Sequence, residues 1–338
     1  MRVQNLKNIN KRGIYISVDI KRIFMKKSLS TYFVPLLFVL GLFLATPAQA
    51  QQEPQYTQYM YNTQVINPAY VGSRGSLSVL GLYRTQWVGL DGAPKTASFS
   101  INSPMGTEGM GIGAGVMHDE IGPQTTTQIT ADFSYTIRMN DDGLKLAFGM
   151  KAGANMVNID GEKLNWYDPN DPSYNFIVKN KTKPIIGAGF FLYDKNWYLG
   201  LSSPSFLSTE YYDDTKVSVY NSHTHFYLSG GYVFTINENL KLKPATIFKV
   251  ASGTSMSADV TLNALFLETF TLGAGYRFQA TSTFNALAGF QVTDQIMIGY
   301  AYDLQTGALQ HYNSGSHEIF LRFELGTRVQ PKVNPRFF

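Results

Sequence analysis

The stretch Ile129-Thr130-Ala131-Asp132-Phe133-Ser134-Tyr135-Thr136-Ile137-Arg138 decides the fold class. Its odd-numbered positions are apolar or aromatic, and its even-numbered positions carry hydroxyl or charged side chains. Because successive side chains of a strand point to opposite faces, this period of two predicts a β-strand with one apolar face. Residues 144–155 and 270–279 alternate in the same way. A soluble sandwich would need a second sheet to cover such faces, whereas lipid covers them in a membrane barrel.

Working outward from this stretch, the alternation recurs along the chain. We count fourteen candidate strands, near residues 76–84, 95–102, 110–118, 125–138, 143–157, 184–193, 196–203, 223–236, 240–250, 256–266, 269–279, 282–292, 294–304 and 316–326. Several have the roughly 9–11 residues that a tilted strand needs to cross hydrocarbon, and an even count is usual for bacterial barrels. The sequence therefore predicts an all-β fold, a transmembrane antiparallel β-barrel of about 14 strands over residues 76–326.

The connections between these strands alternate in length. Five of those after even-numbered strands are tight, at residues 140–143, 194–196, 237–239, 268–269 and 293–294. Longer ones follow odd-numbered strands, at residues 85–94, 160–183, 204–221 and 305–315. The connections at 103–109, 251–256 and 280–282 break the rule. Short periplasmic turns and longer external loops are typical of outer-membrane barrels, so we expect the barrel to lie in the outer membrane with both ends in the periplasm.

The first 50 residues differ from the rest in charge. The 338-residue chain has 28 basic and 24 acidic side chains, but residues 1–50 hold eight of the cations and one of the anions. The remaining 20 basic and 23 acidic side chains give no support to a nucleic-acid partner. Lys26 and Lys27 precede an apolar run at 32–44, and Ala48-Gln49-Ala50 forms an A-x-A cleavage site. We therefore predict a signal peptide over residues 1–50, cut after Ala50, rather than a membrane anchor.

Further features describe the start of the signal peptide and the parts of the chain outside the barrel. Met25 stands directly before the two lysines, where a signal peptide normally starts, so residues 1–24 are interpreted as an over-long start. The chain has no cysteine, which excludes a disulfide framework in an exported protein. Residues 51–75 do not alternate and are rich in Tyr and Gln, which favours an ordered periplasmic or lumen segment. Residues 327–338 form a C-terminal tail.

Charged residues concentrate on the face of the strands that is predicted to point inward. These are Asp132, Arg138, Lys145, Lys151, Lys241, Lys243, Lys249, Asp259, Arg277, Asp303, Glu318, Arg322 and Glu324. A lysine or arginine facing lipid would cost about 2–4 kcal/mol at the midplane, whereas inward charges can pair across the lumen. We interpret them as a structural network rather than a selectivity filter.

No catalytic, cofactor-binding or metal-binding residue is predicted. His223-Thr224-His225 offers two imidazoles on one face, but zinc needs further ligands. Gly111-Ile112-Gly113-Ala114-Gly115 is followed by no helix, so it is interpreted as small inward residues that make room in the lumen and not as a nucleotide motif. Trp87 is expected to anchor the outer interface or to contact a partner. We therefore expect no enzyme and no cofactor.

An ordered set of motifs resembles the PorP/SprF family of type IX secretion and gliding-motility outer-membrane proteins of Bacteroidota. The set runs through 58–62, 66–72, 83–89, 92–96, 111–115, 119–122, 197–202, 299–303 and 317–319. Within it, the positions that carry the resemblance are Asn67, Pro68, Tyr70, Gly72, Arg84, Gln86, Trp87, Gly92, Pro94, Gly200, Tyr300, Asp303, His317 and Glu318. Thr63 stands where many relatives have proline.

The resemblance implies a non-enzymatic component of type IX secretion and gliding motility. Some members resemble dedicated partners of a secreted surface adhesin, whose export or anchoring they support. Others resemble core parts that reach a periplasmic peptidoglycan-binding lipoprotein. On this basis we expect loops 160–183 and 204–221 to form an outward docking surface, and residues 51–75 to close the lumen or to meet a periplasmic partner. The alternative is a diffusion porin or a hydrophobic-solute transporter.

Overall fold

The structure is a computed structural model that describes residues 54–106, 109–160, 163, 177–207, 209–212, 218–251, 256–279, 282–306, 310 and 312–325. A short helix α3 (Thr63–Ile66) and a 3-10 turn η1 (Pro68–Tyr70) precede the strands. The first strands are β1 (Leu77–Thr85), β2 (Lys95–Pro104), β3 (Met110–Ile121), β4 (Gln124–Arg138), β5 (Lys145–Asp160), β6 (Ile177–Tyr193), β7 (Trp197–Ser203), β8 (Thr209–Tyr212) and β9 (Ser218–Ser222). They are followed by β10 (His225–Tyr232), β11 (Phe234–Asn237), β12 (Leu240–Ala251), β13 (Ser257–Phe266), β14 (Phe270–Phe278), β15 (Thr283–Gln291), β16 (Ile296–Gln305) and β17 (Ser316–Leu325).

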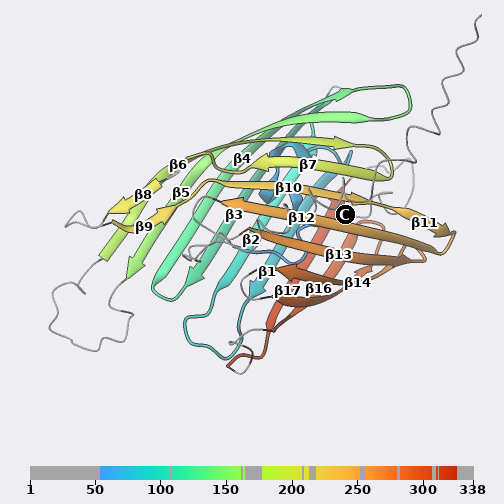
Figure 1. The fold of residues 1–338 in the computed structure, drawn as a ribbon. Helices are drawn as coiled ribbons and strands as arrows, with labels where there is room; N and C mark the ends of the chain where they lie inside the picture. The colour runs from blue at the N-terminus through green and yellow to red at the C-terminus, as the bar shows by residue number, and fades with distance from the viewer. Residues whose placement is uncertain are drawn as a thin grey trace, which may run out of the picture. The chain divides into compact units, whose positions relative to one another are not determined.

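The long strands form one closed antiparallel sheet (Figure 1). The long strands pair in chain order, with β7 paired to β10 across the β8–β9 hairpin. β1 pairs with β17 in the register Leu77 to Leu325 and Thr85 to His317. β10 and β11 both pair with β12 and are separated by Val233 alone. Counted as one interrupted strand, they complete a ring of fourteen among the described residues. The predicted barrel and its strand number are confirmed, whereas the separate hairpin of β8 and β9 was not expected.

The alternation of the sequence becomes the inner and outer faces of this ring. On β4, Phe133 and Tyr135 are 42% and 46% exposed, while Asp132 and Ser134 between them are 5% and 0% exposed. Large apolar side chains are exposed in the same way on nearly every strand. Such a surface is stable only against lipid, which makes this a membrane barrel. Among the residues that the structure describes, no helix has the length and hydropathy needed to cross a bilayer.

The two ends of the barrel carry different connections. One end has the connections 105–109, 139–144, 194–196, 238–239, 267–269 and 292–295. The other end has 86–94, 122–123, 161–176, 204–224, 252–256, 279–282 and 306–315. Because outer-membrane barrels have short periplasmic turns, the second end is the external one.

β6 begins earlier than the sequence pattern indicates. The predicted strand starts at residue 184, but pairing with β5 continues to Ile177. The extra residues are rich in lysine and asparagine, and no apolar alternation marks them because they extend beyond the lipid. The expected loop 160–183 is therefore shorter, at residues 161–176.

A charge placed on the outer face tests this arrangement. We expect Phe133→Lys, near the middle of β4, to lower the free energy of unfolding by about 2–4 kcal/mol, because the ammonium group would face hydrocarbon. Ile137→Lys, on the same face but close to the periplasmic end, should cost no more than about 1 kcal/mol. Urea unfolding in lipid vesicles measures both, and equal losses would contradict the proposed depth of β4.

Candidate functional site: the luminal segment and its seat

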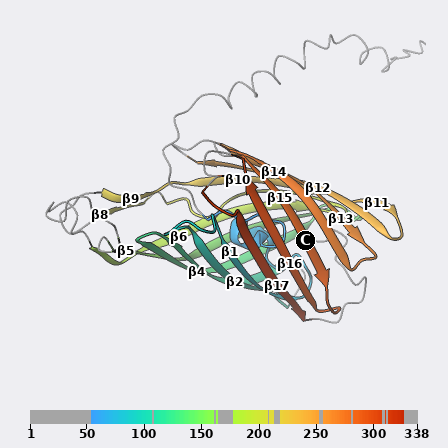
Figure 2. The same ribbon diagram turned by 90° about the horizontal axis from the view of Figure 1, so that it is seen from below.

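Residues 54–75, here called the luminal segment, lie inside the ring of strands (Figure 2, blue). Most of its side chains are buried, and Gln58 and Ala69 are 0% exposed. Its hydrogen bonds reach opposite walls. Thr57 contacts Asp303 on β16, and Asn67 contacts the Phe190 carbonyl on β6. The segment therefore spans the lumen from wall to wall.

The segment extends between the external and the periplasmic ends of the lumen. Gln55 donates to Gln279, just beyond the external end of β14, at 3.2 Å. Arg74, near the other end of the segment, pairs with Glu324 close to the periplasmic end of β17. The chain thus runs inward through the lumen, and β1 starts directly afterwards at the periplasmic end.

Asn67-Pro68-Ala69-Tyr70 forms the turn at the centre of the segment. The Asn67 Oδ1 accepts a hydrogen bond from the Ala69 amide at 3.0 Å, which caps the 3-10 turn, and Pro68 occupies its first position. The Asn67 amide group donates to the Phe190 carbonyl at 3.0 Å. One side chain therefore shapes the segment and fastens it to β6.

Aromatic packing fills the remaining space around the segment. The Tyr61 and Phe320 ring centroids lie 4.6 Å apart, and Tyr70 meets Phe191 edge to face at 5.7 Å. The Arg322 guanidinium lies over the Tyr61 ring, 5.5 Å from its centroid. Such pairs contribute about 0.5–1.5 kcal/mol each beyond the area they bury. The tyrosine-rich composition of the segment is thus explained by burial in a polar lumen.

Three inward glycines, Gly111, Gly149 and Gly189, form the surface on which the segment packs, here called its seat. A Cβ atom at Gly149 would overlap the Ala69 backbone, and one at Gly189 would overlap the Asn67 side chain. At Gly111 it would overlap the carbonyl of Val71. Only the absence of side chains lets the two backbones approach so closely.

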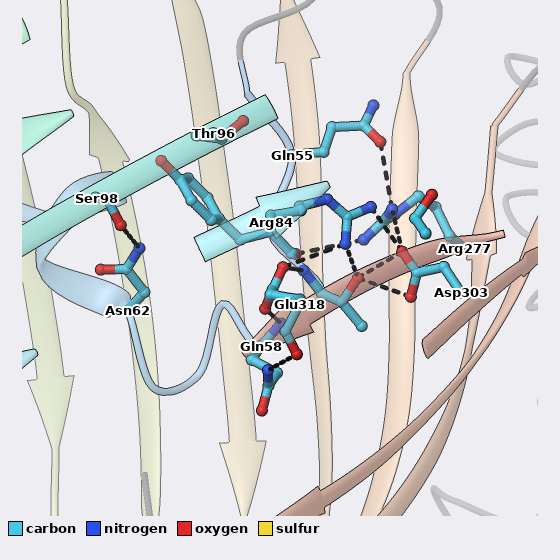
Figure 3. Close-up of polar contacts among 12 residues, drawn as sticks. Gln55, Gln58, Asn62, Arg84, Thr96, Ser98, Arg277, Asp303 and Glu318 are labelled. Carbon is cyan, nitrogen blue, oxygen red and sulfur yellow. Dashed lines mark hydrogen bonds and ion pairs between the residues drawn. The ribbon is translucent and has the colours of Figure 1, made fainter. Parts of the chain in front are cut away.

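A buried ion cluster joins the segment to the external half of the barrel (Figure 3). The Arg84 Nη2 lies 2.7 Å from the Asp303 Oδ2, and its Nη1 lies 3.2 Å from the Glu318 Oε2. The Thr57 hydroxyl accepts from Arg84 at 2.8 Å and donates to Asp303 at 2.6 Å. Glu318 also accepts from the backbone amides of Thr57 and Gln58, at 2.9 and 2.7 Å. The segment therefore supplies donors that the strands lack.

Arg277 on β14 extends the cluster. Its Nε donates to both oxygens of Asp259 at 2.9 Å, and its Nη1 lies 3.7 Å from Asp303. It also donates to the Gln55 side chain and to the Tyr56 carbonyl, each at 3.3 Å. Two guanidinium groups thus face three carboxylates, and the amides of the segment offset the excess negative charge.

A second polar contact holds the segment on the opposite wall. The Lys151 Nζ lies 3.5 Å from Asp132 and donates to the carbonyls of Gln64 and Val65, at 3.2 and 2.9 Å. The Gln64 side chain donates to Asp132 at 3.1 Å.

Most charges predicted to point inward are enclosed, whereas Arg138, at the last position of β4, is exposed.

Comparison with known proteins decides the family. The model of the type IX secretion system membrane protein PorP/SprF matches residues 48–323, which is most of the chain. This chain belongs to the PorP/SprF family. It is therefore an outer-membrane component of the type IX secretion system, a class of membrane barrels rather than of enzymes. The family expected from the sequence is confirmed.

The remaining comparisons concern curated proteins and solved structures. No curated protein matches this PorP/SprF barrel. Among solved structures, it is similar to the KdgM porin, with 10% identity, 74% of this chain and 99% of that chain covered and a TM-score of 0.36. Omp33 of Acinetobacter baumannii has 8% identity, coverage of 74% and 98% and a TM-score of 0.42. The CymD monoaromatic hydrocarbon channel has 11% identity, coverage of 80% and 92% and a TM-score of 0.46.

Several of the positions predicted to carry the family resemblance lie in the luminal segment or against it. Asn67, Pro68 and Tyr70 form its central turn. Gly72 follows with a φ of +74° beside the backbone of Gly111, where a side chain would be strained. Gly200 on β7 faces the Asn67 amide group. These positions, distant in sequence, meet at one place in the lumen.

A second group of the positions predicted to carry the resemblance forms the loop after β1. The Gln86 amide donates to the Pro94 carbonyl at 2.9 Å, and Pro94 is buried. Trp87 has a φ of +48° and its amide donates to Ser316 on β17 at 3.3 Å. Gly92 lies against Gly122 of the next external turn. These contacts hold the loop against β17 and against the next external turn. That Trp87 anchors the outer interface or contacts a partner stays a prediction.

The remaining PorP/SprF positions divide between the two faces of the barrel. Arg84, Asp303 and Glu318 meet in the ion cluster. The Tyr300 hydroxyl lies 2.6 Å from the His317 Nδ1 on the outer face. Ala48 and Ala50, the predicted cleavage positions, lie outside the described residues.

Sequence reasoning did not single out Thr57, Gln64, Gly149 or Gly189 as parts of this site. Thr57 and Gln64 lie in residues 51–75, where the sequence shows no periodic alternation of apolar and polar side chains. Gly149 and Gly189 lie on inward faces, where small residues indicate that another part of the protein comes close to the strand backbone. The alternation does not identify that other part. Among the described residues, no cluster of three or more His, Asp or Glu side chains could hold a metal.

Substitution of Arg84 tests how much the ion cluster contributes to the free energy of unfolding. We expect Arg84→Met to lower the free energy of unfolding by about 3–5 kcal/mol, because Asp303 and Glu318 would remain buried without their guanidinium. Lys241→Met, which breaks a pair with Glu268 near a periplasmic turn, should cost at most about 1 kcal/mol. Urea unfolding in lipid vesicles compares the two variants. Equal losses would show that the cluster does not depend on Arg84.

Proposed function

We propose that this barrel acts as a closed scaffold that supports the export or surface anchoring of a secreted adhesin-type protein. The observation that carries the proposal is the luminal segment, which crosses the lumen between β6 and β16 and is fastened at both walls. A scaffold needs a rigid barrel with external surfaces, and it needs neither an open channel nor a catalytic group.

The alternative, a diffusion porin or a hydrophobic-solute transporter, requires a path through the lumen. The space beside the luminal segment is divided into small cavities, and larger ones have volumes of about 70 and 40 Å³. The inward charges Arg84, Arg277 and Glu318 are engaged with each other or with the segment and do not line an open pore. This arrangement favours the scaffold.

External elements offer the surface for a partner. The connection 204–224 contains the hairpin of β8 and β9, and β5 and β6 continue outward to Asp160 and Ile177 (Figure 1). Both lie at the end that faces the outside in our assignment. We infer that an exported protein docks here, while the periplasmic turns remain free for other secretion components or for a peptidoglycan-binding lipoprotein.

Replacement of the external connection tests the docking role. We expect replacement of residues 204–221 by a short turn to abolish surface retention of the exported protein, while heat-modifiable gel mobility shows that the barrel still inserts. Shortening 306–315 at the same end is the matched control and should leave retention unchanged.

The partner itself is read from a gentle detergent purification of the tagged protein, with mass spectrometry of what co-elutes. A large adhesin lost from the 204–221 variant supports anchoring, and periplasmic lipoproteins alone would favour a core role. Retention that is unchanged when 204–221 and 161–176 are both replaced would contradict the docking role.

Conductance in planar bilayers tests the closed lumen. We expect the purified protein to form no steady channels, because the luminal segment fills the ring. Gly149→Val should raise conductance, since its side chain would displace the Ala69 backbone from its seat. Gly81→Val is the control, as a Cβ at Gly81 meets open space. Steady ohmic channels in the unaltered protein would favour the porin alternative.

A further inference from the structure

The external side of the luminal segment forms the floor of a recess. Two adjoining cavities open there, of about 70 and 40 Å³, and both are lined by Pro54, Tyr56, Ile66 and Tyr227. The larger cavity, here called the external recess, lies among the external parts of β5 and β6 and the start of the 204–224 connection. It is therefore reached from the same side as the proposed docking loops.

The charged side chains that line the external recess are two lysines, Lys151 and Lys183. Lys151 is paired with Asp132 at 3.5 Å and donates to the carbonyls of Gln64 and Val65, so Lys183 carries the charge that a ligand would meet. The adjoining cavity adds Lys249 and Arg277 and holds one carboxylate, Asp259, which Arg277 binds. Lys183 is exposed on the part of β6 that extends outward. An exposed ammonium group at the mouth of a hollow attracts an anionic group.

The rest of the lining is apolar. Val65 and Ile66 of the luminal segment, Ile185 of β6 and Leu207 of the 204–224 connection contribute aliphatic side chains. A volume of about 70 Å³ is well below the roughly 300–1,000 Å³ of pockets that enclose small molecules. It suits one side chain inserted from a larger partner.

We propose that the external recess receives an acidic segment of the exported polypeptide, with one carboxylate beside Lys183 and an apolar neighbour against Ile66 and Leu207. This inference rests on the proposed anchoring function and names the chemistry of the docked segment. The luminal segment is then part of the binding site, because Val65, Ile66 and Tyr56 form its floor. A polysaccharide is less well matched, since its hydroxyl groups would face aliphatic walls.

A defined probe tests the charge preference. A fluorescent peptide of alternating Glu and Leu is titrated with the purified full-length protein in non-ionic detergent, and its anisotropy is compared with that of the Gln–Leu counterpart. We expect the acidic peptide to bind at least about tenfold more tightly, with affinity falling as salt rises. Lys183→Glu should weaken it about tenfold, since it reverses one charge at the mouth.

Lys195→Glu is the matched control, because Lys195 is an exposed lysine in the periplasmic turn after β6. It should leave the affinity unchanged. Equal binding of the two peptides, or equal effects of the two substitutions, would overturn the inference. Tighter binding of polygalacturonate than of the acidic peptide would assign the recess to a polysaccharide instead.

Surface retention in cells separates this inference from the anchoring function. We expect Lys183→Glu to reduce retention of the exported protein, as replacement of residues 204–221 does. If the loop replacement releases the protein and Lys183→Glu does not, the recess inference fails and anchoring stands. If neither releases it, anchoring itself fails.

Discussion

The rest of the structure depends on one constraint, that charges pointing into the barrel must find all their partners inside it. Lipid on the outer face and a narrow lumen leave water little room to solvate Glu318, Asp303 and Asp259. Arg84 and Arg277 provide part of the compensation, and the amides and hydroxyl of Thr57 and Gln58 provide the rest. Because a buried ion pair is stable only when its remaining hydrogen-bonding groups are satisfied, the wall and the luminal segment need each other.

This mutual dependence shapes the barrel wall as well. The glycines that receive the turn at Asn67–Tyr70 lie on β3, β5, β6 and β7, and glycine weakens a strand interior because it has no side chain to pack. Here the backbone of the luminal segment takes the place of those side chains. The wall is thus adapted to an internal polypeptide, which distinguishes it physically from a wall that lines a water-filled pore.

The same arrangement relates the two ends of the barrel. The luminal segment runs from Gln55 at the external ends of the strands to Arg74 near the periplasmic end, so a single stretch of chain contacts both sides of the membrane. Its outer part forms the floor of the external recess, and β6 extends above it. A connection between the two ends of the barrel supports the scaffold role that we propose.

The sequence by itself determined the fold class and most strand positions, because a lipid-facing barrel imposes a period of two that can be read locally, as in Ile129–Arg138. Its ordered motifs also indicated the family. It also placed Asp303, Glu318 and Arg277 on inward faces. It could not say that Asp303 and Glu318 meet Arg84 and Thr57, since these two carboxylates lie more than two hundred residues after Arg84 in the sequence. Whether residues 54–75 enter the lumen was likewise left open, because a segment without periodicity carries no sign of what surrounds it. Only the closure of the ring, which brings β1 against β17, decided those contacts.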